Sequence, residues 1–168
     1  PTAHPASPLY QAGFDLFHPQ LPVFGPPSLL PCEFPLFQAA ASRVMHLGVA
    51  PDAAVRLTAR ICFLITAALV WRLLVDLAGE AAGLAGLAAF LFSPLGLLVS
   101  RMSLIEYMAT AGALAFGLWG LRWHETGKWR WYVAALVAGA VGLLVKSTTG
   151  AIYLVPLMVL VLSALRRG

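Results

Sequence analysis

Charged side chains are scarce in this chain: they make up 11% of its 168 residues, whereas hydrophobic residues make up 60%. Soluble domains carry roughly a quarter charged residues. A composition this apolar, with a mean hydropathy of +0.84, therefore excludes an ordinary soluble domain. The formal net charge is +4, but the basic residues are scattered singly. They do not form the continuous basic stripe that is typical of a nucleic-acid-binding surface. We expect an integral membrane protein in contact with the lipid bilayer and with no nucleic-acid partner.

Cysteine and the familiar site motifs are also nearly absent. Cys32 and Cys62 are the two thiols, and their settings indicate neither a disulfide framework nor a metal site. The four histidines lack metal-ligand spacing. The sequence contains no HExxH, P-loop, GxSxG or GxGxxG pattern. The sequence therefore gives no motif for a zinc-protease site, a nucleotide-binding site or a serine-hydrolase site.

An initiator methionine and a secretory signal are lacking at the start of the sequence. The chain begins Pro-Thr-Ala, without a charged region followed by an apolar one. We expect an internal or trimmed segment of a larger membrane protein. A first membrane helix is expected before Pro1, and more helices could follow Gly168.

Proline, by contrast, is abundant from Pro5 to Pro35 and excludes a long regular helix there. Because this segment is also rich in large apolar groups, we expect an ordered loop packed against the membrane face of the bundle. The spacing of apolar residues from Phe34 to Leu47 then predicts an amphipathic helix in the membrane interface, with Arg43 and His46 on its polar side. Asp52 is a candidate N-cap for the helix that follows.

Long apolar runs fill the rest of the chain and predict an all-α, polytopic membrane protein. We expect residues 1–56 to form the extracytoplasmic loop with its interfacial helix, and residues 57–168 a transmembrane helical bundle. Brief connections predict antiparallel neighbours, and recurring glycines predict close helix packing. The five predicted spans are Leu57–Leu77, Ala81–Val99, Ile105–Leu121, Trp131–Val145 and Thr149–Leu165.

The basic residues predict an orientation by the positive-inside rule. If the proline-rich loop is outside, six of the eleven Lys and Arg residues lie on the cytoplasmic side. The loop, the Arg101–Glu106 segment and the Lys146–Thr149 turn then meet on the opposite face. Aromatic residues gather at the connector between Arg122 and Arg130, as in an aromatic belt. The six basic residues are Arg72, Arg122, Lys128, Arg130, Arg166 and Arg167.

Two carboxylates are the candidate catalytic groups. Glu33, expected at the membrane surface, could act as a base, orient a substrate or ligate a divalent cation; alternatively it caps the amphipathic helix in water. Glu106 shares a short polar island with Arg101 between two apolar runs, where charge is costly unless it lies at the boundary or lines a polar cavity. Its alternative is a capping box, with Ser103 as the N-cap.

Four cations are candidate substrate-binding groups. The planar guanidinium of Arg101 matches a phosphate, although snorkelling from a helix end would also account for it. Lys146 could pair with a phosphate or with Glu106, or snorkel to the interface. Arg56 and Arg60 lie on one helix face and could attract an anionic head group or remain solvated.

Five short segments occur in an order that resembles the N-terminal half of bacterial GT-C glycosyltransferases. These enzymes use polyprenyl-phosphate sugars and are similar to aminoarabinose-lipid A transferase and protein O-mannosyltransferase. The similarity covers most of the chain. The segments are Gly13–Gln20, Cys32–Gln38, Val55–Arg60, Ser100–Glu106 and Val145–Lys146.

The resemblance implies roles for single residues. The family's acidic E-x-P-L site, near the donor phosphate and the acceptor, matches Glu33 and the three residues after it. Its S-R-x-x-x-x-D pattern ends at Glu106, which stands in place of the usual Asp, and a basic residue that assists the lipid phosphate matches Lys146. The family's catalytic Asp would fall at or before Pro1, and Asp15 matches a non-catalytic position.

The implied reaction transfers a sugar from a polyprenyl-phosphate donor to a lipid, glycan or protein acceptor at the outer face of the bacterial inner membrane. An acidic residue would deprotonate or orient the acceptor, and cations would stabilise the departing phosphate. No cofactor is implied beyond the divalent cation that Glu33 could hold. The alternative is a non-catalytic membrane module or a transporter half, to which the helix break at Ser93–Pro94 points.

Overall fold

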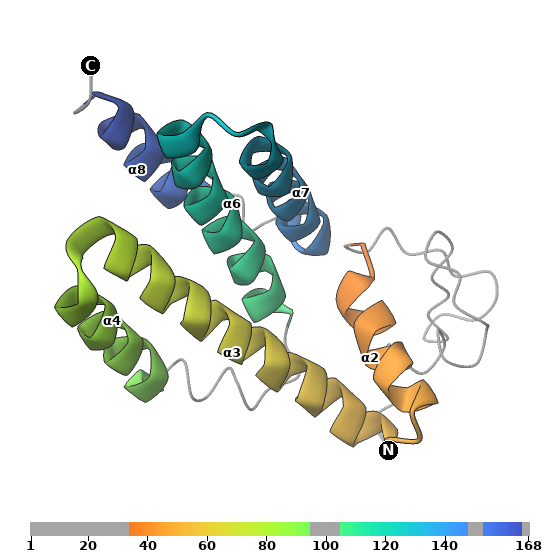
Figure 1. Ribbon diagram of the computed structural model, residues 1–168. Coiled ribbons are helices and arrows are strands. Elements are labelled where there is room, and N and C mark those ends of the chain that lie inside the picture. Colours follow the sequence, from red (N-terminus) through yellow and green to blue (C-terminus); the bar gives the residue numbers. More distant parts are fainter. Residues whose placement is uncertain (1–33, 95–104, 148–152, 166–168) are drawn as a thin grey trace.

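The computed structural model describes residues 34–94, 105–147 and 153–165, and the regular structure in these ranges is helical, with no strand (Figure 1). This confirms the all-α prediction for the described residues. The predicted proline-rich loop up to Glu33 lies outside them. The described helices are α2 (Leu36–His46), α3 (Pro51–Ala78), α4 (Glu80–Phe92), α6 (Glu106–Thr126), α7 (Trp129–Val145) and α8 (Leu154–Leu165).

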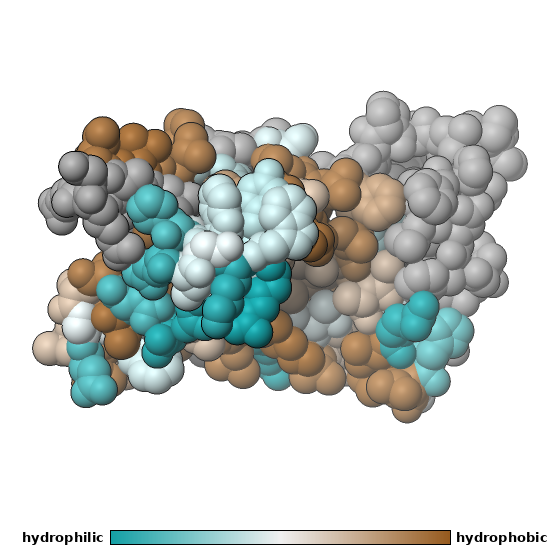
Figure 2. Space-filling view, turned by 45° about the horizontal axis from the view of Figure 1, so that its top comes forward, coloured by the Kyte–Doolittle hydropathy of each residue, from teal (hydrophilic) through white to brown (hydrophobic). Residues whose placement is uncertain are grey.

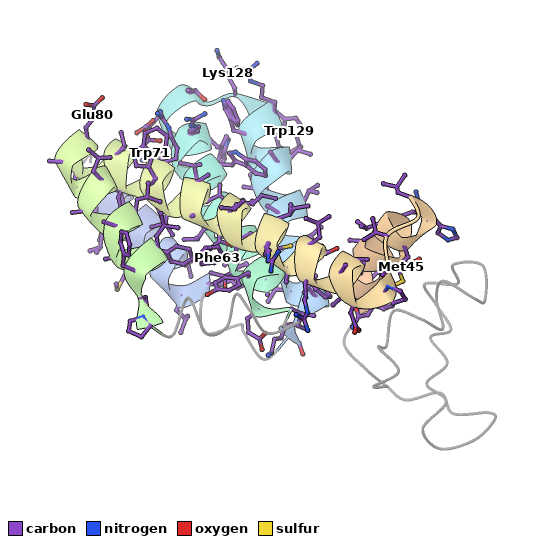
Figure 3. All side chains as sticks on the ribbon, turned by 90° about the horizontal axis from the view of Figure 1, so that it is seen from below. Met45, Phe63, Trp71, Glu80, Lys128 and Trp129 are labelled. Atoms are coloured by element: carbon purple, nitrogen blue, oxygen red, sulfur yellow. The ribbon has the colours of Figure 1, made fainter. Side chains whose placement is uncertain are left out.

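Helix α2 is the amphipathic helix predicted before the first span. Phe37 and Met45 are buried, whereas Arg43 and His46 are exposed. The buried face packs against the first turns of α3 around Val55, and Met45 lies where the two helices meet (Figure 3). The sequence therefore predicted this helix and its apolar face, while its place at a membrane surface stays a prediction.

Helix α3 has 28 residues and begins at Pro51, which occupies the first helical turn. A residue without an N–H group and with a fixed φ suits that position. Because the N-cap is Ala50, the prediction that Asp52 caps this helix is wrong. Asp52 lies in the first turn instead, where a carboxylate is favoured by the helix dipole. Gly79, with a φ of 87°, then turns the chain into α4.

Helices α6 and α7 touch backbone to backbone at two glycines. A Cβ atom on Gly112 of α6 would lie 2.7 Å from the Cα atom of Gly142 in α7 and 2.9 Å from the carbonyl oxygen of Ala138. Only glycine permits so close an approach of two helices. The Tyr153 hydroxyl donates to the carbonyl oxygen of Gly139 at 3.1 Å. The predicted packing through small residues is confirmed at this contact.

The packing of successive helices follows the prediction in part. Among the described helices, α3 packs along α4 and α6 along α7, as expected for antiparallel neighbours (Figure 1). Helix α6, however, packs against α3 rather than α4, and α8 packs against α6 rather than α7. Helix α6 is thus central, and its contacts with α3, α7 and α8 position both of its ends.

The outward faces of the bundle are apolar. Leu64 in α3, Val137 in α7 and Met158 in α8 are 62%, 57% and 58% exposed. Soluble monomers rarely expose broad apolar faces. By length and composition, one described helix, α3, could cross a membrane; α4 and α7 are apolar but shorter. A bundle that crosses the membrane five times stays a prediction.

Thr66 links α3 to α6. Its hydroxyl is fully buried and lies 2.8 Å from the carbonyl oxygen of Cys62 in its own helix and 3.0 Å from that of Tyr107 in α6. Thr66→Val keeps the shape but removes the hydrogen bond between helices. We therefore expect the free energy of unfolding in detergent to fall by about 1 kcal/mol. Thr58→Val is the matched control, because this buried hydroxyl bonds Ala54 within α3. Equal losses for the two variants would show that the contact with α6 contributes nothing.

Candidate functional site

An ion pair joins the start of α6 to the end of α7. Lys146 Nζ donates to Glu106 Oε1 at 2.5 Å, across 40 positions of sequence. The two side chains are partly buried, with 23% of Lys146 and 34% of Glu106 exposed. Pairing with Glu106, one of the alternatives open for Lys146, is present in the structure. A charge-assisted hydrogen bond of this kind is among the stronger side-chain contacts.

The backbone explains why these two side chains meet. Helix α7 ends at Val145, and Lys146 is extended, with φ −156° and ψ 97°, although its N–H still bonds the carbonyl oxygen of Gly142 at 3.2 Å. The contact between Gly112 and Gly142 holds the two helices at a short distance. The end of α7 therefore lies within side-chain reach of the first residue of α6.

Helix α6 begins at Glu106, with Ile105 at the N-cap position and no side-chain cap. The predicted capping box, with Ser103 as the N-cap, is therefore wrong, and Ser103 itself lies outside the described residues. The physical reason is that Glu106 is the first helical residue, whereas a capping box needs the carboxylate at the third, and one of its oxygens is held by Lys146. At the first helical position the carboxylate is also favoured by the helix dipole.

The second carboxylate oxygen of Glu106 leaves the pair able to accept a further hydrogen bond. Oε2 is shielded from solvent and accepts no hydrogen bond within the part of the chain that the structure describes. Leaving a buried acceptor unpaired costs about 1–3 kcal/mol, so a group of this kind calls for a donor from elsewhere. The pair thus offers a positive charge and a hydrogen-bond acceptor side by side.

Helix α2 reaches the same end of the bundle. The Phe34 N–H donates to the carbonyl oxygen of Leu144 at 3.1 Å, two residues before Lys146. Ile105, directly before Glu106, packs against the apolar core between α2 and α3. The starts of α2 and α6 and the end of α7 therefore converge. This confirms, for the described residues, that these distant stretches meet at one end.

The other predicted site residues fall into two groups. Glu33 and Arg101 lie outside the described residues. Arg56 and Arg60 are exposed on α3, and no contact between them and the ion pair occurs among the described residues.

A second charged cluster was not predicted as a unit. Asp76 Oδ1 accepts from Arg72 Nη2 at 2.8 Å, and its Oδ2 lies 3.8 Å from Arg122 Nη2. The guanidinium carbons of Arg122 and Arg130 lie 5.3 and 5.1 Å from the ring centre of Trp131. The i, i+4 spacing of Arg72 and Asp76 was the one signal in the sequence. This cluster lies at the opposite end of α6 from the ion pair.

A cavity of about 430 Å³ opens between α6, α7 and α8 near the α6–α7 connector. Its lining is almost wholly apolar and includes Phe116, Trp123 and Leu157. Because a sugar needs several convergent polar groups, this cavity is not a candidate sugar site. In the described ranges, no group of three His, Cys, Asp or Glu side chains could hold a metal ion.

The described part of the chain is thus a helical bundle with apolar outer faces and a charged pair at one end. The protein-family model for dolichyl-phosphate-mannose-protein mannosyltransferases matches residues 31–168, and the chain belongs to this family. The family supports a glycosyltransferase-type function and, in general terms, a lipid-linked sugar donor. Searches of curated proteins and of solved structures gave no match.

Proposed function

We propose that the chain is part of a membrane glycosyltransferase that transfers a sugar from a polyprenyl-phosphate donor to a lipid, glycan or protein acceptor. The observation that carries the proposal is the Glu106 carboxylate, which binds Lys146 through one oxygen and keeps a buried, unpartnered oxygen beside it. Family membership supplies the class of reaction. In this proposal the pair belongs to the transfer site.

Lys146 is the group suited to the donor phosphate. When the bond between the sugar and the phosphate breaks, negative charge grows on the departing polyprenyl phosphate, and a positioned cation lowers the barrier. Glu106 holds the ammonium in place before the substrate arrives. Because the pair itself is neutral, a further cation is needed to attract the donor. We assign that role to Arg101, with Arg56 and Arg60 at the same end of the bundle steering the anionic donor.

The carboxylates are suited to the acceptor. Glu106 Oε2 could accept a hydrogen bond from the attacking hydroxyl and orient it toward the sugar. Glu33 is the candidate base for the same hydroxyl. The bond between Phe34 and Leu144 supports this assignment, because the residue after Glu33 is thereby tied to the segment that ends in Lys146. A divalent cation at Glu33 is the alternative role for that carboxylate.

The proposed setting is the bacterial inner membrane, crossed five times by the bundle. The apolar outward faces of α3, α7 and α8 support it, since lipid is the solvent that such faces favour. In the proposed orientation the ion pair faces the extracytoplasmic side, and the α6–α7 connector with its basic residues faces the cytoplasm.

The test is sugar transfer by the full-length protein in proteoliposomes supplied with labelled polyprenyl-phosphate sugars. We expect transfer by the wild type and a loss of about 100-fold or more in Glu33→Gln, as for removal of a general base. Unimpaired transfer by Glu33→Gln would remove that residue from the site. Absence of any transfer together with uptake of a solute would contradict the proposal and favour the transporter alternative.

A further inference from the structure

Three arginines and one carboxylate, Asp76, lie at the connector end of the bundle. Arg72 makes the short contact with Asp76 at 2.8 Å, and Arg122 lies 3.8 Å from the second oxygen, which is too long for a hydrogen bond. Arg122 and Arg130 both lie over the Trp131 ring. We call these five residues the arginine cluster. Its members come from α3, α6 and α7, so tertiary packing brings their charges together.

The arginine cluster has more positive charge than its own residues neutralise. Each guanidinium presents five N–H donors in a rigid fork, yet among the described residues Arg130 has the Trp131 ring as its contact and no carboxylate. The first turn of α7, which contains Arg130, carries no acidic residue. The adjoining connector adds Lys128 and one carboxylate, Glu125. Like charges held this close repel one another, so an anion between them would be stabilised.

The surroundings match the head-group level of a bilayer. Trp123 and Trp129 each pack on the Tyr132 ring with centroids 4.8 Å apart, and tryptophan and tyrosine favour the membrane–water boundary. Figure 2 shows hydrophilic side chains gathered on the face that carries the connector, with hydrophobic side chains beside them. In Figure 3, Lys128 and Trp129 mark this connector, far from Met45 at the opposite end of the structure.

We propose that the arginine cluster binds the phosphate of an anionic phospholipid in the leaflet opposite the transfer site. The forked donors of Arg122 and Arg130 suit a phosphate, and their shared contact with the Trp131 indole keeps the two forks near each other. The inference rests on the membrane setting of the proposed function but not on sugar transfer. It concerns the far end of α6 from Glu106, so it is separate from the donor site.

Tryptophan fluorescence of the full chain in nanodiscs tests the proposal. Trp131 belongs to the arginine cluster, and the chain's other tryptophans include Trp123 and Trp129 beside it. Brominated phosphatidylglycerol and brominated phosphatidylcholine are compared as quenchers at the same mole fraction in a phosphatidylcholine bilayer. Since each basic residue near the surface contributes about 1 kcal/mol toward anionic lipid, we expect phosphatidylglycerol to quench about five- to tenfold more effectively. Equal quenching by the two lipids would overturn the proposal.

Variants test whether Arg122 and Arg130 cause the preference for phosphatidylglycerol. In Arg122→Gln/Arg130→Gln, the ratio of quenching by phosphatidylglycerol to quenching by phosphatidylcholine is expected to fall to about one to two, because two of the basic residues that attract anionic lipid are gone. Arg43→Gln removes an exposed charge from α2, at the opposite end of the structure, and is expected to keep the wild-type ratio. If the glutamine pair does not fold, Arg122→Lys/Arg130→Lys keeps the charge without the fork and is expected to give an intermediate ratio. Equal ratios in the cluster variant and the wild type would contradict the assignment.

Two further measurements distinguish a lipid phosphate from a soluble phosphate, and the lipid site from the proposed sugar transfer. Glycerophosphate added to the buffer is expected not to reduce the preference; if it abolishes the preference, the site binds a soluble phosphate and the lipid proposal fails. Sugar transfer is measured in the same nanodiscs. A lipid preference without sugar transfer would support this inference and contradict the proposed function. Sugar transfer without a lipid preference would support the proposed function and contradict this inference.

Discussion

Replacing Lys146 with methionine is expected to slow sugar transfer by about 100- to 1,000-fold, the usual cost of removing one group that stabilises developing negative charge. Methionine keeps much of the length and the apolar stem of lysine but has no charge. The readout is single-turnover transfer by the reconstituted full-length protein, because it isolates the chemical step. A loss confined to the apparent affinity for the donor would mean that Lys146 stabilises the bound donor and the transition state equally.

The same variant should also lose stability, and a partner variant separates the two effects. Lys146→Met leaves the Glu106 carboxylate without its charged donor, which costs about 1.5–3 kcal/mol for a hydrogen bond to a charged group. Glu106→Gln/Lys146→Met removes both charges and is expected to recover most of that stability without recovering transfer. If transfer returned together with stability, the pair would be a structural link between α6 and α7 and nothing more.

Gly112→Ala is expected to lower the free energy of unfolding by about 2–3 kcal/mol, the upper range for overpacking a tight contact. The new methyl group would lie 2.7 Å from the Cα atom of Gly142. Backbone atoms cannot rotate away as a side chain can, so α6 and α7 must separate. That separation would also move Lys146 from Glu106, and we expect sugar transfer to fall with stability.

Gly86→Ala is the matched control for this prediction. A Cβ atom there would lie 2.0 Å from Leu74 Cδ1, which is the end of a flexible side chain on α3. Rotation of Leu74 relieves that clash, so we expect a smaller loss of stability and unchanged coupling at the ion pair. Thermal unfolding of both variants in the same detergent, followed by circular dichroism, gives the comparison. Equal losses for Gly86→Ala and Gly112→Ala would show that the backbone contact has no special role.

Apolar runs and their periodicity predicted where the described helices lie, and glycine content predicted the close packing of α6 with α7. The apolar spacing around Phe37 and Met45 predicted α2 and its buried face, because helix geometry alone places such residues on one side. The bounds of α7 were predicted to within a few residues. The pairing of α6 with α3 was not predicted, because nearest-neighbour reasoning from connector length does not determine which apolar faces fit together.

Helix starts and ion pairs were predicted less well, for reasons specific to each residue. Asp52 and Ser103 are good N-cap residue types. The helices begin at Pro51 and Glu106, however, so that Ala50 and Ile105 occupy the N-cap positions. The pairing of Lys146 with Glu106 was one of several open alternatives, because the contact depends on glycines that bring the helices together. Arg122 near Asp76 was missed for the same reason, since its partner lies on another helix.

The central claim is that Glu106 and Lys146 act on the substrate from fixed positions. Its most direct test is sugar transfer by the charge-swapped variant Glu106→Lys/Lys146→Glu in proteoliposomes, with folding checked by thermal unfolding. The swap keeps an ion pair between α6 and α7 but exchanges the positions of the acceptor and the cation. We predict a folded protein whose transfer rate is at least about 100-fold below that of the wild type. A folded variant that transfers sugar at the wild-type rate would contradict the claim.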